Sequence, residues 1–230
     1  MRDDICTIPV SEVFEETDGC PICRMRDRVE ERILDYIMGP AMMEPDVRQS
    51  TNETGFCPGH LQKMLARRGR LSLALMLETH LQHIQEEIVD KHGLFSAPAK
   101  KGAQAQSVAK DCFLCRKIDW GMERMLATVC RLYEEEGDFR RLFDAQRGFC
   151  LPHYAALLQT ADKKQMRGYY AAFEKSLSAG VAEDLTALLS DMRKYCSMYD
   201  YRSGREAADW GDARDAVERA VGFLTSRRPE

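Results

Sequence analysis

The sequence contains no apolar run approaching the roughly 18 residues that a membrane-spanning helix requires. Its first ten residues also lack the apolar stretch of a secretory signal peptide. We therefore expect a cytoplasmic protein with no membrane segment.

A strong charge of one sign is also missing. The chain has 33 basic and 37 acidic residues, which are intermixed and give a formal net charge of −4. Such a chain presents no broad positive field to a polyanion, so a nucleic acid is an unlikely partner.

Recognisable catalytic motifs are absent as well. The sequence has no Gly-rich phosphate loop, no Ser-His-Asp arrangement and no His-Glu-x-x-His motif on a predicted helix. Apolar residues make up 44% of the chain and charged residues 30%, as in an ordinary globular protein. We expect a folded protein that is more plausibly non-enzymatic, and an enzyme with a pocket between its halves is the least favoured alternative.

Cysteines are abundant instead, and their spacing forms a pattern that occurs twice. Nine are present, and this odd number without a secretion signal disfavours a disulfide framework. In the first occurrence, 33 residues lie between Cys20-Pro-Ile-Cys23 and Cys57-Pro-Gly-His60. In the second, 34 residues lie between Cys112-Phe-Leu-Cys115 and Cys150-Leu-Pro-His153.

Residues outside these motifs repeat too, which indicates an internal duplication. Residues Glu31–Leu34 match Glu123–Leu126 at an offset of 92. The Gly-Phe-Cys segments Gly55–Cys57 and Gly148–Cys150 match at an offset of 93. The register therefore slips by a single residue between the matched elements.

The strong periodicity is helical, so we predict an all-α fold with two pseudo-repeated helical halves, each organised by a Cys3His metal site. The first repeat covers residues 1–95, a flexible linker 96–110, and the second repeat 111–201. Residues 202–230 hold a polar connection and a C-terminal amphipathic helix that we expect to begin at Asp212. Its predicted inward-facing residues are Ala213, Val217, Ala220, Val221 and Leu224.

The repeated residue types are those of a structural zinc site. Cys-x-x-Cys brings two sulfurs onto one ion, and thiolate with imidazole suits zinc. The ligands of Cys-x-x-His share one face of a helix. Since three cysteines and one histidine complete a tetrahedron, no position is left for a reacting water. We predict two zinc ions per chain. Each ion is expected to be held by the Cys-x-x-Cys and Cys-x-x-His motifs of the same repeat.

Other interpretations of the eight residues remain open. An iron–sulfur cluster with one histidine ligand uses the same side chains. Reduced, buried cysteines with core histidines would bind no metal. A redox-active dithiol is disfavoured because a thioredoxin-like site needs a βαβ context that a helical chain does not offer.

Several further residues could carry chemistry but are more simply interpreted as ordinary parts of the fold. His80, His83 and Glu87 share a helical stripe and could form a third metal site, although a polar flank beside the core is the favoured interpretation. The remaining cysteines are predicted to be ordinary packing residues. They are Cys6, Cys130 and Cys196.

The duplicated Cys-Pro-x-Cys-Arg and Gly-Phe-Cys-x-x-His elements resemble an uncharacterised bacterial family known only as a domain of unknown function. The resemblance spans about Asp18 to Leu224. It implies paired metal sites in a bacterial cytoplasmic protein and no known activity. The second copy departs from the pattern, because Phe113 stands where the first copy has Pro21.

These observations predict a zinc-binding helical protein that acts as an interaction or regulatory module, most plausibly with a protein partner. The closed sites favour this class because closed zinc sites mainly supply folding free energy. The alternative is a metal- or redox-responsive switch, in which thiolate oxidation releases zinc and loosens one half.

Overall fold

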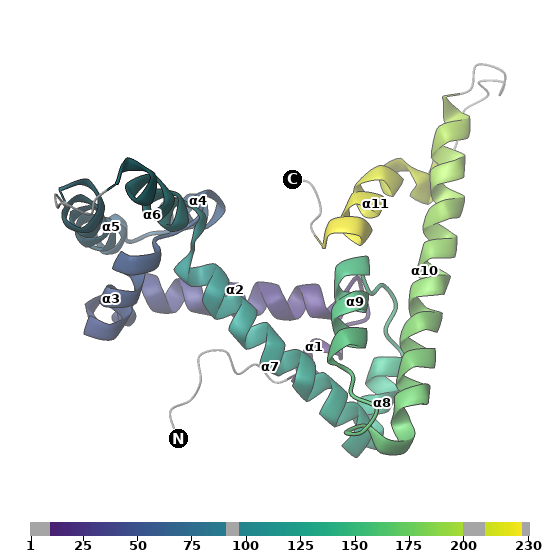
Figure 1. Ribbon diagram of the computed structural model, residues 1–230. Coiled ribbons are helices and arrows are strands. Elements are labelled where there is room, and N and C mark those ends of the chain that lie inside the picture. The colour runs from purple at the N-terminus through teal and green to yellow at the C-terminus, as the bar shows by residue number, and fades with distance from the viewer. Residues whose placement is uncertain (1–9, 91–96, 200–209, 227–230) are drawn as a thin grey trace. The chain divides into compact units, whose positions relative to one another are not determined.

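A computed structural model of the chain describes residues 10–90, 97–199 and 210–226 (Figure 1). Every regular element in this part of the chain is a helix, so the predicted all-α fold is confirmed. Among these residues, no helix combines the length and apolar character needed to cross a membrane.

The chain forms two compact units, and they do not coincide with the two sequence repeats. Among the described residues, the first unit lies within 27–122, and the second combines residues 10–26 with those after 122. The chain passes between units within helix α2 (Pro21–Met38) and again within helix α7 (Phe113–Glu135). Each unit therefore contains segments of both repeats, and the predicted linker at 96–110 falls inside the first unit.

Between α2 and α7, the described residues of the first unit form six further elements. They are the 3-10 helix η1 (Pro40–Met43), α3 (Pro45–Thr54), α4 (Pro58–Ala66), α5 (Arg70–Ile84), the π-helix η2 (Gln85–Val89) and α6 (Pro98–Lys110). Four of them begin with proline, which lacks a backbone N–H and suits the first helical turn. Helix α3 packs against α5 and buries Val47, while α5 buries Leu73 and Met76.

Helix α6 occupies most of the segment predicted to be a flexible linker. The expectation of an irregular chain is wrong here, because Pro98 supplies a helix start and the following residues are good helix formers such as Ala, Lys and Gln. None of its residues is buried. The sequence signal for a linker, a lack of large apolar side chains, therefore marks an exposed helix.

Besides the first turns of α2 and the later part of α7, seven elements form in the part of the second unit that the structure describes. They are α1 (Val10–Val13), α8 (Gly137–Asp144), α9 (Leu151–Thr160), η3 (Arg167–Tyr169), α10 (Tyr170–Met198), η4 (Gly211–Asp215) and α11 (Ala216–Thr225). Its core is a cluster of buried aromatic rings centred on Phe143, whose ring centroid lies 5.0 to 5.8 Å from those of four neighbours. The neighbours are Phe14, Tyr133, Phe149 and Phe173.

The C-terminal helix forms as predicted, but its orientation is not the predicted one. A 3-10 turn from Gly211 to Asp215 precedes it, so Asp212 does not cap the α-helix. Of the residues expected to face inward, Ala213 is fully buried, whereas Val217, Val221 and Leu224 are exposed by 36%, 38% and 57%. The alanines Ala213 and Ala216 make the close contact instead, because small side chains allow backbones to approach.

Truncation of Phe143 to alanine should destabilise the protein by about 3–5 kcal/mol, because four aromatic partners lose their central contact. Thermal and denaturant unfolding of the metal-loaded chain would measure this change. Leu189→Ala is the matched control, since Leu189 is 47% exposed on α10, and it should cost less than about 1 kcal/mol. Equal losses in the two variants would contradict the assignment of the core.

Candidate metal centres

The structure brings the eight predicted ligands together in two groups of three cysteines and one histidine. The Cys57 site consists of Cys57, His60, Cys112 and Cys115, all in the first unit. The Cys20 site consists of Cys20, Cys23, Cys150 and His153, all in the second unit. The predicted pairing of motifs within one repeat is wrong, because each site takes its cysteine pair from one repeat and its Cys-x-x-His motif from the other.

The stiffness of α2 explains why the motifs of one repeat do not meet. Cys23 lies in its first turn, and Glu30, seven residues further on, contacts His60 at 2.8 Å between Oε1 and Nε2. Seven residues of α-helix rise by about 10 Å, whereas zinc binds sulfur and nitrogen at about 2.0–2.3 Å. Cys23 and His60 are therefore too far apart to share one ion.

The two Cys-x-x-His motifs adopt the same local structure. Cys57 is the N-cap of α4 with φ −71° and ψ 160°, and Cys150 is the N-cap of α9 with φ −69° and ψ 156°. Each is followed by a proline in the first helical turn, so both thiols lie where the free backbone N–H groups of a helix favour negative charge. This agreement supports the duplication inferred from the sequence.

The distances between ligand atoms fit a single tetrahedral ion. With zinc bond lengths, a tetrahedron separates two sulfurs by about 3.8 Å and a sulfur from a nitrogen by about 3.6 Å. The Sγ–Sγ distance is 3.8 Å for Cys23 and Cys150 and 3.9 Å for Cys57 and Cys115. The distances from histidine Nδ1 to the sulfurs range from 3.1 to 3.5 Å over the two sites. Each group could therefore hold one metal ion.

The glycine before each Phe-Cys pair allows the two motifs of a site to approach closely. Gly55 has φ +64°, and its carbonyl accepts a 3.0 Å hydrogen bond from the backbone N–H of Phe113, inside the Cys-Phe-Leu-Cys motif. Gly148 has φ +91°, and a Cβ there would lie 3.3 Å from the carbonyl carbon of Gly19. Pro21, the counterpart of Phe113, has no N–H to donate, so this hydrogen bond cannot form at the Cys20 site.

His60 has an outer partner that the sequence analysis missed. Its Nε2 contacts the buried carboxylate of Glu30, and Lys63 donates to the other oxygen of Glu30 at 2.6 Å. A carboxylate in this position fixes the orientation of a metal-ligating imidazole and leaves Nδ1 free for the ion. The only available signal was an acidic residue beside the apolar stripe of a predicted helix, which is too common to be informative.

The Cys20 site has a different outer partner, the end of the C-terminal helix. Ser226 Oγ lies 3.0 Å from Cys150 Sγ, and the carbonyl oxygen of Ser226 lies 3.7 Å from Cys23 Sγ. Arg24 also braces this site, because its guanidinium donates to the carbonyl of Val13 at 3.1 Å. The arginine after the first cysteine pair therefore secures the chain that leads into the site.

The ligand residues of each site perturb one another's protonation. Contacts with Cys112 and Glu30 raise the pKa of His60 to about 10. Burial would raise the pKa of the Cys112 thiol, but the contact with His60 and backbone hydrogen bonds lower it to about 6. At the other site, contacts with Cys20 and Cys23 lower the pKa of Cys150 well below its usual range. Each group thus favours an anionic sulfur next to a cationic imidazole.

The stripe of His80, His83 and Glu87 does not form a metal group among the described residues. The ring of His80 packs over Gly55, and its Nδ1 donates to the carbonyl of Asn52 at 2.8 Å. A Cβ on Gly55 would lie 2.6 Å from His80 Nε2. His80 therefore supports the segment that leads into the Cys57 site.

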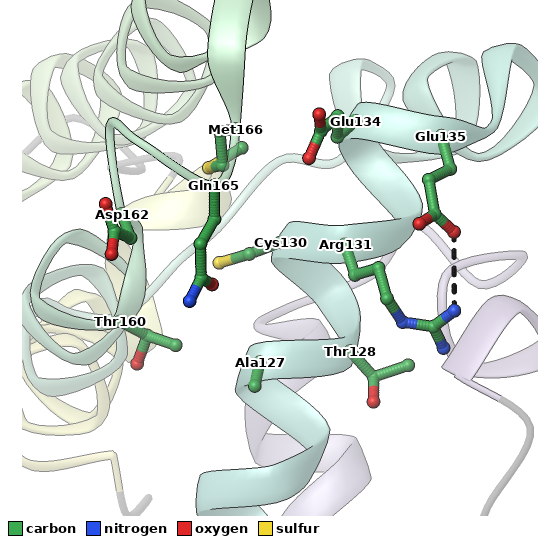
Figure 2. A pocket seen from close by; sticks show the side chains of 10 residues that line it. All are labelled: Ala127, Thr128, Cys130, Arg131, Glu134, Glu135, Thr160, Asp162, Gln165 and Met166. Atoms are coloured by element: carbon green, nitrogen blue, oxygen red, sulfur yellow. Dashed lines mark hydrogen bonds and ion pairs between the residues drawn. The ribbon is translucent and has the colours of Figure 1, made fainter.

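Cys130 lines a pocket of about 420 Å³ between α7 and residues 160–166 (Figure 2). Its side chain is buried, in agreement with the predicted packing role, and burial raises the pKa of its thiol to about 11. Arg131 and Glu135 form an ion pair of 3.3 Å at the same pocket. Cys196 is exposed on α10, so a packing role is wrong for it, and Cys6 lies outside the described residues.

Comparisons with known proteins identify the chain only by its family. The model of a family of unknown function (DUF6062) matches residues 1–230, so the resemblance seen in the motifs is confirmed. No curated protein and no solved structure matches the chain.

Cys130 and Cys196, which lie outside these groups, should differ strongly in reactivity. At pH 7, a pKa of about 11 leaves roughly one thiol in ten thousand as the reactive thiolate, and Cys130 is buried as well. Iodoacetamide should therefore label exposed Cys196 at least about 100-fold faster than Cys130 in the folded protein. Peptide mass spectrometry over time gives both rates, and similar rates would contradict the burial of Cys130.

Proposed function

We propose that this chain, which belongs to the family of unknown function DUF6062, is a two-zinc protein in which the ions organise a helical surface for a protein partner. The proposal depends on one observation above all. Each group of four ligand atoms lies within 4.8 Å, at the separations expected around one tetrahedral zinc ion.

The compactness of the groups favours zinc over an iron–sulfur cluster. In a cluster, different irons take different protein ligands, so the ligand atoms are spread around several metal atoms. Here the sulfurs of Cys57 and Cys115 are 3.9 Å apart, and both lie within 3.4 Å of the same nitrogen. Three thiolates with one imidazole are also a common ligand set of structural zinc.

A structural role follows from the closed ligand set. Four protein ligands complete the tetrahedron, whereas catalytic zinc keeps a position for water or substrate. Each ion would also join two helix starts that are distant in sequence, α4 with α7 in one site and α2 with α9 in the other. Zinc would therefore stabilise each unit, and the biological task would belong to the surface that the helices present.

A reducing compartment suits this proposal, because the ligands must remain thiolates to hold zinc. We place the protein in the bacterial cytoplasm on this ground and on the family resemblance. A protein is the favoured partner, since the nearly balanced charge of the chain does not favour a nucleic acid.

A redox-responsive switch is the second candidate, and one observation favours it. Cys57 and Cys115 are only partly buried, with sulfurs 3.9 Å apart. Hydrogen peroxide could oxidise these two thiolates to a disulfide, with uptake of two protons and formation of two water molecules, and the site would release its zinc. Zinc release by mild peroxide at the rate of a change in oligomeric state or partner binding would favour this candidate over the first.

Metal counts on double variants test both the ion and the ligand pairing. Wild-type protein purified anaerobically should contain two zinc ions and lack the absorbance at about 400 nm that marks an iron–sulfur cluster. Cys20→Ala/Cys150→Ala removes two ligands of one site and should retain one ion. Cys20→Ala/Cys57→Ala damages both sites and should retain none. The reverse result for the two double variants would support pairing within each repeat, and a brown iron-containing protein would replace zinc with an iron–sulfur cluster.

Removal of one ligand should unfold one unit and leave the other folded. Cys57→Ser should lose the ion of the Cys57 site, and His153→Ala that of the Cys20 site. About 10 kcal/mol of zinc-binding free energy supports each unit if the sites resemble small zinc domains. Circular dichroism melts and hydrogen exchange would then show lower helicity and protection in the affected unit. If both variants lose an ion but keep wild-type stability, the ions are not structural.

The partner is tested by cross-linking the zinc-loaded chain in its host and identifying the captured protein by mass spectrometry. The complex should then form from the two purified proteins and should disappear when zinc is removed. An unchanged affinity for the metal-free chain would separate partner binding from zinc and contradict the proposed role of the ions.

A further inference from the structure

We propose that an ion bound at the Cys20 site keeps α11 docked on the second unit, through a hydrogen bond from Ser226 Oγ to the Cys150 thiolate. We call α11, held in this way, the latch. This inference depends on the proposed zinc site and adds a coupling between its occupancy and the docking of α11. The hydroxyl lies 3.0 Å from Cys150 Sγ, a short separation for an O–H group and a sulfur.

The backbone of Ser226 indicates that this contact is specific. Its φ is +61°, and it is the single non-glycine residue with positive φ among the described parts of the chain. A left-handed conformation is unfavourable for a residue with a Cβ, and helices usually place glycine at such an end. Serine at this position supplies a hydroxyl that glycine lacks, and this hydroxyl lies against a ligand of the Cys20 site.

The helix itself has few other attachments. Ala216 is the only buried residue of α11, which packs against α9 and α10 in the second unit (Figure 1). An ion pair of 2.8 Å joins Arg219 to Asp191 of α10. A helix with so little buried apolar surface depends strongly on the contacts at its ends, and the contact at its C-terminal end is with the metal ligands.

Occupancy of the site gives the coupling its direction. A bound ion holds the Cys150 sulfur as a thiolate at a fixed position beside Ser226, where it accepts a charge-assisted hydrogen bond. Zinc at the Cys20 site therefore strengthens the attachment of Ser226 to Cys150, and the docked helix in turn strengthens zinc binding. The 3.7 Å contact of Cys23 with the Ser226 carbonyl needs a thiol proton, so it does not contribute in the loaded site.

The coupling belongs to one site only. At the Cys57 site, the outer hydrogen bond runs from His60 Nε2 to Glu30, a residue of α2 that is buried and paired with Lys63. No residue of α11 contributes to that group. The Cys57 site therefore serves as an internal reference for every measurement on the latch.

The decisive variant is Ser226→Gly, because glycine suits the backbone conformation and removes only the hydroxyl. Chelator competition on the full-length, zinc-loaded protein should show about tenfold weaker zinc binding at the Cys20 site. The Cys57 site should change less than twofold. The Cys150→Ala variant lacks the Cys20 site. The zinc-release step that is missing from its chelator competition is therefore the step of that site. Thr225→Ala is the control, since the Thr225 hydroxyl bonds to the Val221 carbonyl at 2.7 Å within the same helix.

Hydrogen exchange of the α11 amides supplies a second readout that a simple helix-capping role would not reproduce. If Ser226 only ends the helix, the glycine variant should exchange at the wild-type rate or more slowly. The latch predicts about tenfold faster exchange in the zinc-loaded variant, and a smaller difference between variant and wild type after zinc is removed.

The outcomes separate the latch from the proposed function. Wild-type protein without zinc overturns both proposals. Two zinc ions per chain, with unchanged zinc release and unchanged α11 exchange in Ser226→Gly, overturn the latch and leave the zinc protein intact. Equal weakening of both sites also overturns it, because the effect would then be a general loss of stability.

Discussion

The length and stiffness of α2 determine how the rest of the structure is connected. The helix carries Cys23 in its first turn and Glu30 two turns later, and His60 contacts Glu30. A single ion cannot bridge the roughly 10 Å that separates these positions along the helix axis. Each cysteine pair therefore completes its site with the Cys-x-x-His motif of the other repeat, and each compact unit takes segments from both repeats.

The exchange of ligands between repeats costs little chain entropy compared with what a metal ion can supply. In the structure, Cys23 and Cys150 are 127 residues apart, and His60 and Cys112 are 52 apart. Sites within each repeat would have joined residues that are 34 and 35 apart, Cys23 with Cys57 and Cys115 with Cys150. Each doubling of loop length costs about 0.6 kcal/mol, so the longer loops add about 1–2 kcal/mol in total. If each site holds zinc, as we propose, binding on the order of 10 kcal/mol per site would outweigh this difference.

The sequence was sufficient to identify the eight residues that gather in two groups, because cysteine and histidine at these fixed spacings, repeated twice, are typical of metal sites and rare elsewhere. It was also sufficient for the long helices, since their apolar periodicity extends over several turns. The pairing of motifs could not be predicted from the sequence. Each Cys-x-x-Cys motif can combine with either Cys-x-x-His motif, and the ligand types of the sites are the same in both arrangements, as with disulfide connectivity. The buried face of α11 was missed for a related reason. Valine and leucine at helical spacing predicted an inward stripe, but the contact is made by Ala213 and Ala216.

The two sites share their ligand types but differ in the groups that surround them, and this difference follows from a few substitutions between the repeats. At the offset of 92, Met122 stands in place of Glu30, so the second repeat offers no equivalent carboxylate for its histidine. Pro21 stands in place of Phe113 and cannot make the backbone hydrogen bond that joins the motifs of the Cys57 site.

At the Cys20 site, a residue from the end of the chain supplies an outer contact, with Ser226 against Cys150. Outer partners tune the affinity and orientation of metal ligands without changing the ligand set. After a duplication, one site can therefore take its outer hydrogen bond from the packed helices of its own unit. The other site can depend on a C-terminal helix that buries little apolar surface. A protein built in this way can use the same metal chemistry for permanent stability in one unit and for a conditional contact in the other.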